Sequence, residues 1–267
     1  MTRMGIAYQN KVAIPGPTSF SSTGITTTVP GFSGTNLLYE DPWLLLKTAS
    51  VSGTVTVALT FASAQTVSVY GIINHNLRSA GYTSVTFEHW TGTAWTADIS
   101  GVSMSSDTDV LVPNNSNISA TQFRFNLGTA SGNFFVGSFF LGIIVQMSRN
   151  PDAAGVLQTR AAPMLIEESA GGARHIIKGA PKRTGRMELT WQRAIPIDIE
   201  TVKQMDEYSL VGIISPEQAD TMTQPVGHEV FYGYVTSNTT SPRGPGSTLT
   251  GTASARYDWT LELEGAV

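Results

Sequence analysis

Four histidines are the residues of this 267-residue chain best suited to acid–base or metal chemistry near neutral pH. They are His75, His89, His175 and His228. None has a second histidine one helical turn away, and the zinc-protease motif H-E-x-x-H is absent. The chain also has no cysteine, which excludes disulfides and thiolate zinc sites. The sequence therefore predicts no metal ion and no cofactor.

The first histidine motif is YGIINHNL at 70–77, where His75 stands between two asparagines. Asparagine side chains favour turns because their amides bond to nearby backbone. One interpretation is therefore the end of a strand that turns, latched by Asn74 and Asn76. The alternative is a polar patch at the rim of a β-sandwich, where a ligand binds.

The second motif, FEHWTGTAW at 87–95, carries two tryptophans. Alternation along a strand places His89 on the face opposite Trp90. Trp90 and Trp95 flank a short turn, which predicts a cross-strand aromatic pair. The alternative is sugar binding by exposed rings. The candidate glycan-binding residues are Tyr82, His89, Trp90 and Trp95.

Hydrolytic chemistry finds little support. No G-x-S-x-G is present. Adjacent carboxylates such as Glu167 and Glu168 face opposite ways in a strand, so they form no acid/base dyad. Glu188, Asp198 and Glu229 lie in well-patterned segments, where each is also explained as the polar side of a strand or a helix cap. The prediction is that the protein is not an enzyme and has no catalytic residue.

A cluster of positive charge lies in GAPKRTGR at 179–186. No strand-to-helix phosphate loop surrounds it, so a basic loop that faces an acidic neighbour is the better interpretation. The candidate assembly contacts are Lys182, Arg183, Arg186 and Arg243.

Composition narrows the class of partner. Charged residues make up 13% of the chain, against about 25% in typical soluble proteins. The net charge is −4 with no basic block, which argues against nucleic acid. The longest apolar stretch, at 134–145, is too short to span a bilayer, and it predicts two buried β-strands. The small fraction of charged residues also suits a protein that buries much of its surface against partners.

The chain changes character near residue 150. Before it, short alternating segments such as TVTVALTF at 54–61 predict strands, and helical periodicity is absent. After it, charged residues become more frequent. We expect an arm or extended lead-in at 1–35, a jelly-roll β-sandwich at 36–150, and a β-rich domain at 151–267. The last of these should carry one helix near 198–209 and a long loop near 238–254.

Several segments carry a family resemblance. They are NLLYEDPWLLLKT (36–48), VTVALTFASAQTVSVYGIINHNL (55–77), FEHWTGTAWTA (87–97), QFRFNL (122–127), FFVGSFFLGIIVQMSRN (134–150) and YDWTLELEGAV (257–267). Together they resemble an F5/8-type, discoidin-like (galactose-binding-like) jelly roll. The version they resemble most is found in minor tail proteins of bacteriophages.

That resemblance implies a structural component of a phage tail tip or baseplate. Such proteins form ring-like homo-oligomers that join the tail tube to other tip proteins, so the implied location is the virion tail, after synthesis in the host cytoplasm. The implied partners are other phage tail proteins, with host glycan as a further candidate and neither nucleic acid nor membrane insertion. The alternative function is a carbohydrate-binding adhesin module that recognises host-surface glycan.

Overall fold

The computed structural model groups the chain into two units. Unit 1 comprises Met1–Asn150 with Ser209–Tyr232, and unit 2 comprises Pro151–Tyr208 with Gly233–Val267. The structure describes residues 5–13, 15–39, 44–107, 109–147, 153–161, 164–168, 174–178, 182–194, 205, 210–214, 230–242 and 257–265. The prediction of a mainly β protein whose first domain is a jelly-roll β-sandwich is confirmed.

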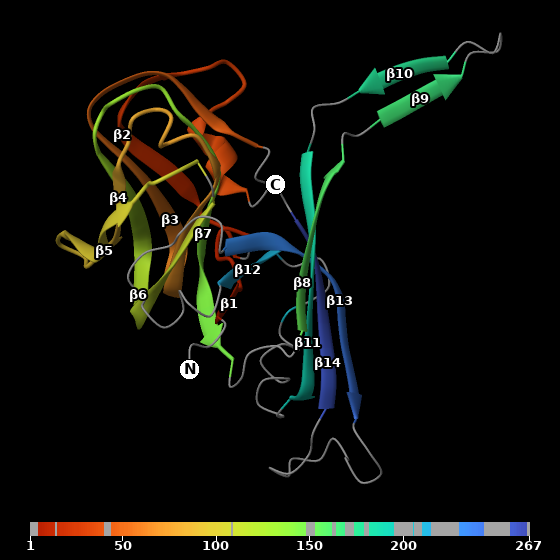
Figure 1. Ribbon diagram of the computed structural model, residues 1–267. Helices are drawn as coiled ribbons and strands as arrows, with labels where there is room; N and C mark the ends of the chain where they lie inside the picture. The colour runs from red at the N-terminus through yellow and green to blue at the C-terminus, as the bar shows by residue number, and fades with distance from the viewer. Residues whose placement is uncertain are drawn as a thin grey trace. The chain divides into compact units, whose positions relative to one another are not determined.

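The first sheet of unit 1 has the strand order β2–β3–β6–β4–β5 (Figure 1). Its strands are β2 (Ser19–Thr28), β3 (Leu46–His75), β4 (Ser84–Trp90), β5 (Trp95–Ser103) and β6 (Val110–Thr129). β4 and β5 form a hairpin whose turn closes with a hydrogen bond from the Thr91 N–H to the Ala94 carbonyl.

The second sheet of unit 1 has the order β6–β3–β7–β1–β12. It adds β1 (Gly5–Tyr8), β7 (Phe135–Gln146) and β12 (Leu210–Ile214). β3 and β6 belong to both sheets, and their register shifts between Thr60 and Gln65 of β3. The two longest strands thus pass from one sheet into the other and hold the sandwich together.

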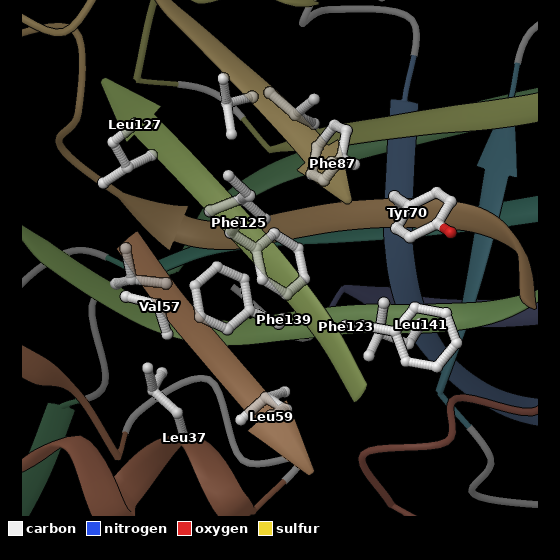
Figure 2. Close-up of a cluster of buried hydrophobic side chains, with 14 of the residues drawn as sticks. Leu37, Val57, Leu59, Tyr70, Phe87, Phe123, Phe125, Leu127, Phe139 and Leu141 are labelled. Carbon is white, nitrogen blue, oxygen red and sulfur yellow. The ribbon is translucent and has the colours of Figure 1, made fainter. Parts of the chain in front are cut away.

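Aromatic rings from both sheets fill the space between them. Phe125 of the first sheet stacks on Phe139 of the second, with ring centroids 3.7 Å apart (Figure 2). Tyr70 of the second sheet stacks on Phe87 of the first at 5.3 Å. Each of these residues is almost fully buried. Burying one such ring stabilises the fold by about 2 kcal/mol, so these contacts join the layers.

The first 35 residues differ from the predicted arm. β1 is fully buried and pairs with β7 on one side and β12 on the other. β2 pairs with the first half of β3, and a short 3-10 helix, η1 (Gly34–Leu38), follows. The Ser- and Thr-rich composition of residues 1–35 predicted an arm, because composition alone does not reveal that β1 pairs with β7 and β12 and that β2 pairs with β3.

Unit 2 contains a four-stranded sheet in the order β13–β14–β11–β8. Its strands are β8 (Ala153–Ala161), β11 (Lys182–Ala194), β13 (Val230–Pro242) and β14 (Tyr257–Gly265). A separate two-stranded sheet consists of β9 (Met164–Glu168) and β10 (Arg174–Lys178).

Three predictions for the second half meet different outcomes. The helix near 198–209 lies outside the described residues, except for a buried bend at Met205. Of the loop predicted near 238–254, residues 238–242 lie in β13 and pair with β14, and the others lie outside the described residues. The three basic residues expected in a loop lie in β11 instead, where Lys182 pairs with Ala161 of β8. No helix in the described part of the chain has the length and hydropathy that crossing a membrane requires.

Candidate functional site

The outer face of the β4–β5 hairpin carries the most promising group of side chains. Val85 and Phe87 of β4 point into the core, so alternation turns Glu88 and Trp90 outward. Trp90 lies opposite Trp95 of β5, and the two half-buried indoles are 5.4 Å apart with their planes tilted by 59°. The predicted cross-strand aromatic pair is confirmed.

An arginine from the neighbouring strand completes this group. Arg124 of β6 lies opposite Glu88, and its Nε–H donates to the Glu88 carboxylate at 2.5 Å. Its guanidinium carbon also lies 4.4 Å from the ring centroid of Trp95, in cation–π contact. We call Glu88, Trp90, Trp95 and Arg124 the tryptophan platform. Three strands thus supply one interlocked set of aromatic and charged groups outside the core.

His89 faces the opposite side of the same strand. Its Nδ1 lies 2.6 Å from the Asp98 carboxylate, and the Tyr70 hydroxyl donates to the other oxygen of Asp98 at 2.6 Å. The Asp98 side chain is 2% exposed and that of His89 17%. Burial, followed by the hydrogen bond and the charge of Asp98, raises the pKa of Tyr70 far above its usual value. The Tyr70 hydroxyl therefore stays protonated and serves as a permanent donor.

A break in the β4–β5 register explains how Asp98 reaches that position. Phe87 lies opposite Ile99 and Glu88 opposite Ala97, which leaves Asp98 as an extra residue on β5. A bulge of this kind re-aims a side chain. Asp98 therefore points toward Tyr70 and His89, and its hydrogen bond to Tyr70 attaches the hairpin to the core.

The structure brings two of the four candidate glycan residues together and separates the others. Trp90 and Trp95 share the platform, whereas His89 lies on the inner side of β4. Tyr82 is 2% exposed and packs edge-to-face on Phe134 in the core, with ring centroids 5.4 Å apart. A buried Tyr82 cannot contact a ligand on the platform.

Sequence reasoning missed Glu88, Arg124, Asp98 and Tyr70. Alternation in EHW and QFRFNL already places Glu88 and Arg124 on outer faces, but their pairing depends on strand order. Asp98 depends on a bulge that leaves no clear mark in the sequence.

The YGIINHNL motif is a latch. Asn74, one residue before the end of β3, has a φ of 50°, in the left-handed region that asparagine tolerates. The Asn76 side-chain oxygen accepts from the Phe135 N–H at 2.7 Å. His75 is 3% exposed, and its Nδ1 accepts from the Leu77 N–H at 3.3 Å. The predicted strand end and turn are confirmed, and so is the bond of the Asn76 side chain to backbone, whereas the predicted role of the Asn74 side chain stays a prediction.

Two aspartates beside this latch differ in their electrostatics. Burial raises the pKa of Asp109 to about 6, although the Asn74 N–H bonded to it opposes the shift. Burial would also raise the pKa of Asp107, but hydrogen bonds from Ser79 and from the Arg78 N–H, with the charge of His75, lower it overall. Among the described residues, no group of three or more His, Asp or Glu side chains is placed to hold a metal ion.

The structure gives strand positions for three of the four candidate assembly residues. Lys182, Arg183 and Arg186 lie in β11, where Arg186 is opposite Leu157 of β8 and Glu264 of β14. Arg243 lies outside the described residues. Their role as contacts stays a prediction.

Comparisons with known proteins give limited guidance. No protein-family model matches the sequence, and no curated protein matches it. The solved structures that it resembles include a chitosan-binding module from the chitosanase/glucanase of Paenibacillus sp. IK-5, at 16% identity and TM-score 0.40, covering 51% of this chain and 99% of that one.

Another is the family 32 carbohydrate-binding module of NanJ from C. perfringens in complex with galactose, at 11% identity and TM-score 0.40. That match covers 53% of this chain and 99% of that module. Values this low assign the chain to no family. Nothing in these comparisons indicates a bacteriophage tail protein.

Proposed function

We propose that unit 1 is a carbohydrate-binding module whose ligand contacts the tryptophan platform. The observation that carries this proposal is the pair of half-buried indoles, Trp90 and Trp95, outside the core and beside a fixed guanidinium. The C–H face of a sugar ring is apolar and packs on an aromatic face, while its hydroxyls need polar partners at the edge. The platform supplies both from three adjacent strands.

The alternative use of the same residues is structural. A cross-strand indole pair stabilises a hairpin by about 1 kcal/mol without any ligand. However, the β4–β5 hairpin is already held from its inner side by Phe87 in the core and by the Asp98 latch. Because the hairpin has these other attachments, its anchoring does not depend on the outer aromatic pair alone, which supports a role of that pair in recognition.

The test compares glycan binding by the full chain with binding by Trp90→Ala, on a glycan array and by isothermal titration. The matched control is Tyr39→Ala, since Tyr39 is an aromatic side chain that is 59% exposed and lies at the end of η1. We expect Trp90→Ala to abolish binding and Tyr39→Ala to retain it. Equal binding by all three proteins, or none by the unmodified chain, would overturn the proposal.

A second candidate is the structural role in a phage tail that the sequence resemblance implies. It is supported by the β9–β10 hairpin, a two-stranded sheet of its own. Such a ribbon is marginally stable in water, and strands of a neighbouring copy would stabilise it. Ring formation, location in the virion tail and contacts with other tail proteins all belong to this candidate.

Native mass spectrometry of the full chain tests it. A closed ring of identical subunits is expected, and it should dissociate when β9–β10 is deleted. A monomer at high micromolar concentration would contradict it. This outcome is independent of the glycan experiment, so the two candidates are separable.

A further inference from the structure

Arg124 is the most constrained cation on the outer face of the first sheet. Its Nε–H donates to Glu88, and its guanidinium carbon lies 4.4 Å from the ring centroid of Trp95. The side chain is nevertheless 21% exposed. Among the described residues, no hydrogen-bond partner is recorded for its two terminal nitrogens. The guanidinium is therefore held through its Nε–H and by Trp95, while its terminal nitrogens have no acceptor among the described residues.

These free donors define which ligand groups suit the platform. The terminal nitrogens of a guanidinium bind the two oxygens of a carboxylate through two parallel hydrogen bonds, whereas a hydroxyl offers a single oxygen and does not match that geometry. Because Arg124 is already fixed, little side-chain entropy is lost when a ligand binds. A neutral ligand that covered these donors without accepting from them would leave them unsatisfied, at a cost in affinity.

Glu88 adds little attraction for a positively charged sugar, and it weakens the attraction of Arg124 for an acidic one. Its carboxylate already accepts from Arg124, and its side chain is 11% exposed, so it offers little to an amino sugar. The same carboxylate weakens the positive field around Arg124, which limits the gain from a ligand anion. The terminal nitrogens of Arg124 can still donate, so the site favours a ligand group that accepts hydrogen bonds.

We propose that the platform selects glycans with a carboxylate, such as uronate-containing polysaccharides, through the terminal nitrogens of Arg124. This inference rests on the proposed carbohydrate-binding function and names its ligand class. The indoles would hold the sugar ring, and Arg124 would hold the acid group beside it.

The experiment titrates the full chain with acidic polysaccharides, each paired with its own carboxyl-reduced form, and with chitosan as a cationic control. The two acidic polysaccharides are polygalacturonate and alginate. We expect the carboxyl-reduced forms to bind about tenfold more weakly, which is the effect of losing one charge-assisted contact. Binding of the acidic forms should weaken as salt rises from 0.05 to 0.5 M, while binding of the reduced forms should not.

Arg124→Lys should lose about tenfold in affinity for the acidic forms and leave the reduced forms within twofold. Arg78→Lys is the matched control, since Arg78 is exposed and lies outside the platform. The salt series uses only the unmodified protein, so it decides the matter even if Arg124→Lys unfolds.

Each outcome separates the two proposals. Equal, salt-independent binding of acidic and reduced forms that depends on Trp90 would overturn the acidic preference and keep carbohydrate binding. Tighter binding of chitosan than of the acidic forms would do the same. No binding of any acidic, neutral or cationic glycan would overturn the carbohydrate-binding function itself.

Discussion

Two regions of unit 1 place a histidine among other polar side chains, and they use these groups differently. In the turn after β3, the side-chain atoms of Asn76 and His75 accept from backbone N–H groups nearby. In the β4–β5 hairpin, His89 and Asp98 are bonded on the inner face, while Trp90 and Trp95 stay half-exposed on the outer face. Polar groups that the fold already satisfies act as latches. In the proposed function, recognition uses the groups that keep accessible surface and donors.

The largest loss of stability should come from removing the Asp98 side chain, which bonds to Tyr70 and His89 on the inner face of the hairpin. Asp98→Ala removes the acceptor of the buried Tyr70 hydroxyl and the partner of His89. We expect a loss of about 3 kcal/mol in the free energy of unfolding, because a buried donor is left without a partner. Urea unfolding followed by circular dichroism measures it.

Tyr70→Phe provides the control for that prediction. In the Tyr70→Phe background, Asp98→Ala should cost at least about 1 kcal/mol less, since the orphaned hydroxyl is gone. A cost that is the same in both backgrounds would show that the Tyr70–Asp98 bond does not hold the hairpin.

How far the sequence predicts this arrangement depends on the range of the interaction. Alternation within β4 correctly separates His89 from Trp90, and the short turn correctly pairs Trp90 with Trp95. Both are local features, set by the two-residue period and by a four-residue connection.

The rest required long-range information. Arg124 reaches Glu88 only because β6 lies beside β4, 36 positions away in the chain. Tyr82 was a candidate for glycan binding, yet it packs on Phe134, which immediately precedes β7. Strand order and the β5 bulge, which no local pattern specifies, decide these positions.

The second prediction concerns the turn region. The folded pKa of Asp109 is about 6, above the value near 4 of an unfolded chain, so the fold favours its protonated form. This contribution is fully present below pH 4 and is lost as the pH rises through 6. Asp109→Asn mimics the protonated form and keeps an acceptor for the Asn74 N–H.

We therefore expect Asp109→Asn to be more stable than the unmodified protein at pH 8. The full shift corresponds to about 3 kcal/mol, and about 2 kcal/mol remains because part of the side chain reaches solvent. The difference should vanish near pH 4. Urea midpoints at pH 8, 6 and 4 measure it, and an unchanged midpoint at pH 8 would contradict the prediction.

The third prediction sharpens the difference between the two indoles. Trp95 contacts both Trp90 and Arg124, whereas Trp90 contacts Trp95 alone among the recorded ring interactions of the described residues. Trp95→Ala should therefore lower the free energy of unfolding by about 1.5 kcal/mol and Trp90→Ala by about 1 kcal/mol. Thermal unfolding ranks the two variants, and the reverse order would contradict the cation–π contact.

The smallest effect should come from Asp107, which lies in the same turn region as Asp109 but is exposed. Its hydrogen bonds from Ser79 lower its pKa below the unfolded value, so its contribution is present above about pH 4 and is lost as the pH falls through the folded pKa. Asp107→Asn should destabilise the protein at pH 7 by about 0.5 kcal/mol, since solvent screens the site. The sign is thus opposite to that of Asp109→Asn, and the same pH series of urea midpoints measures both. If both variants stabilise the protein at pH 8, then burial rather than hydrogen bonding governs Asp107, and the two aspartates are not the contrasting pair described above.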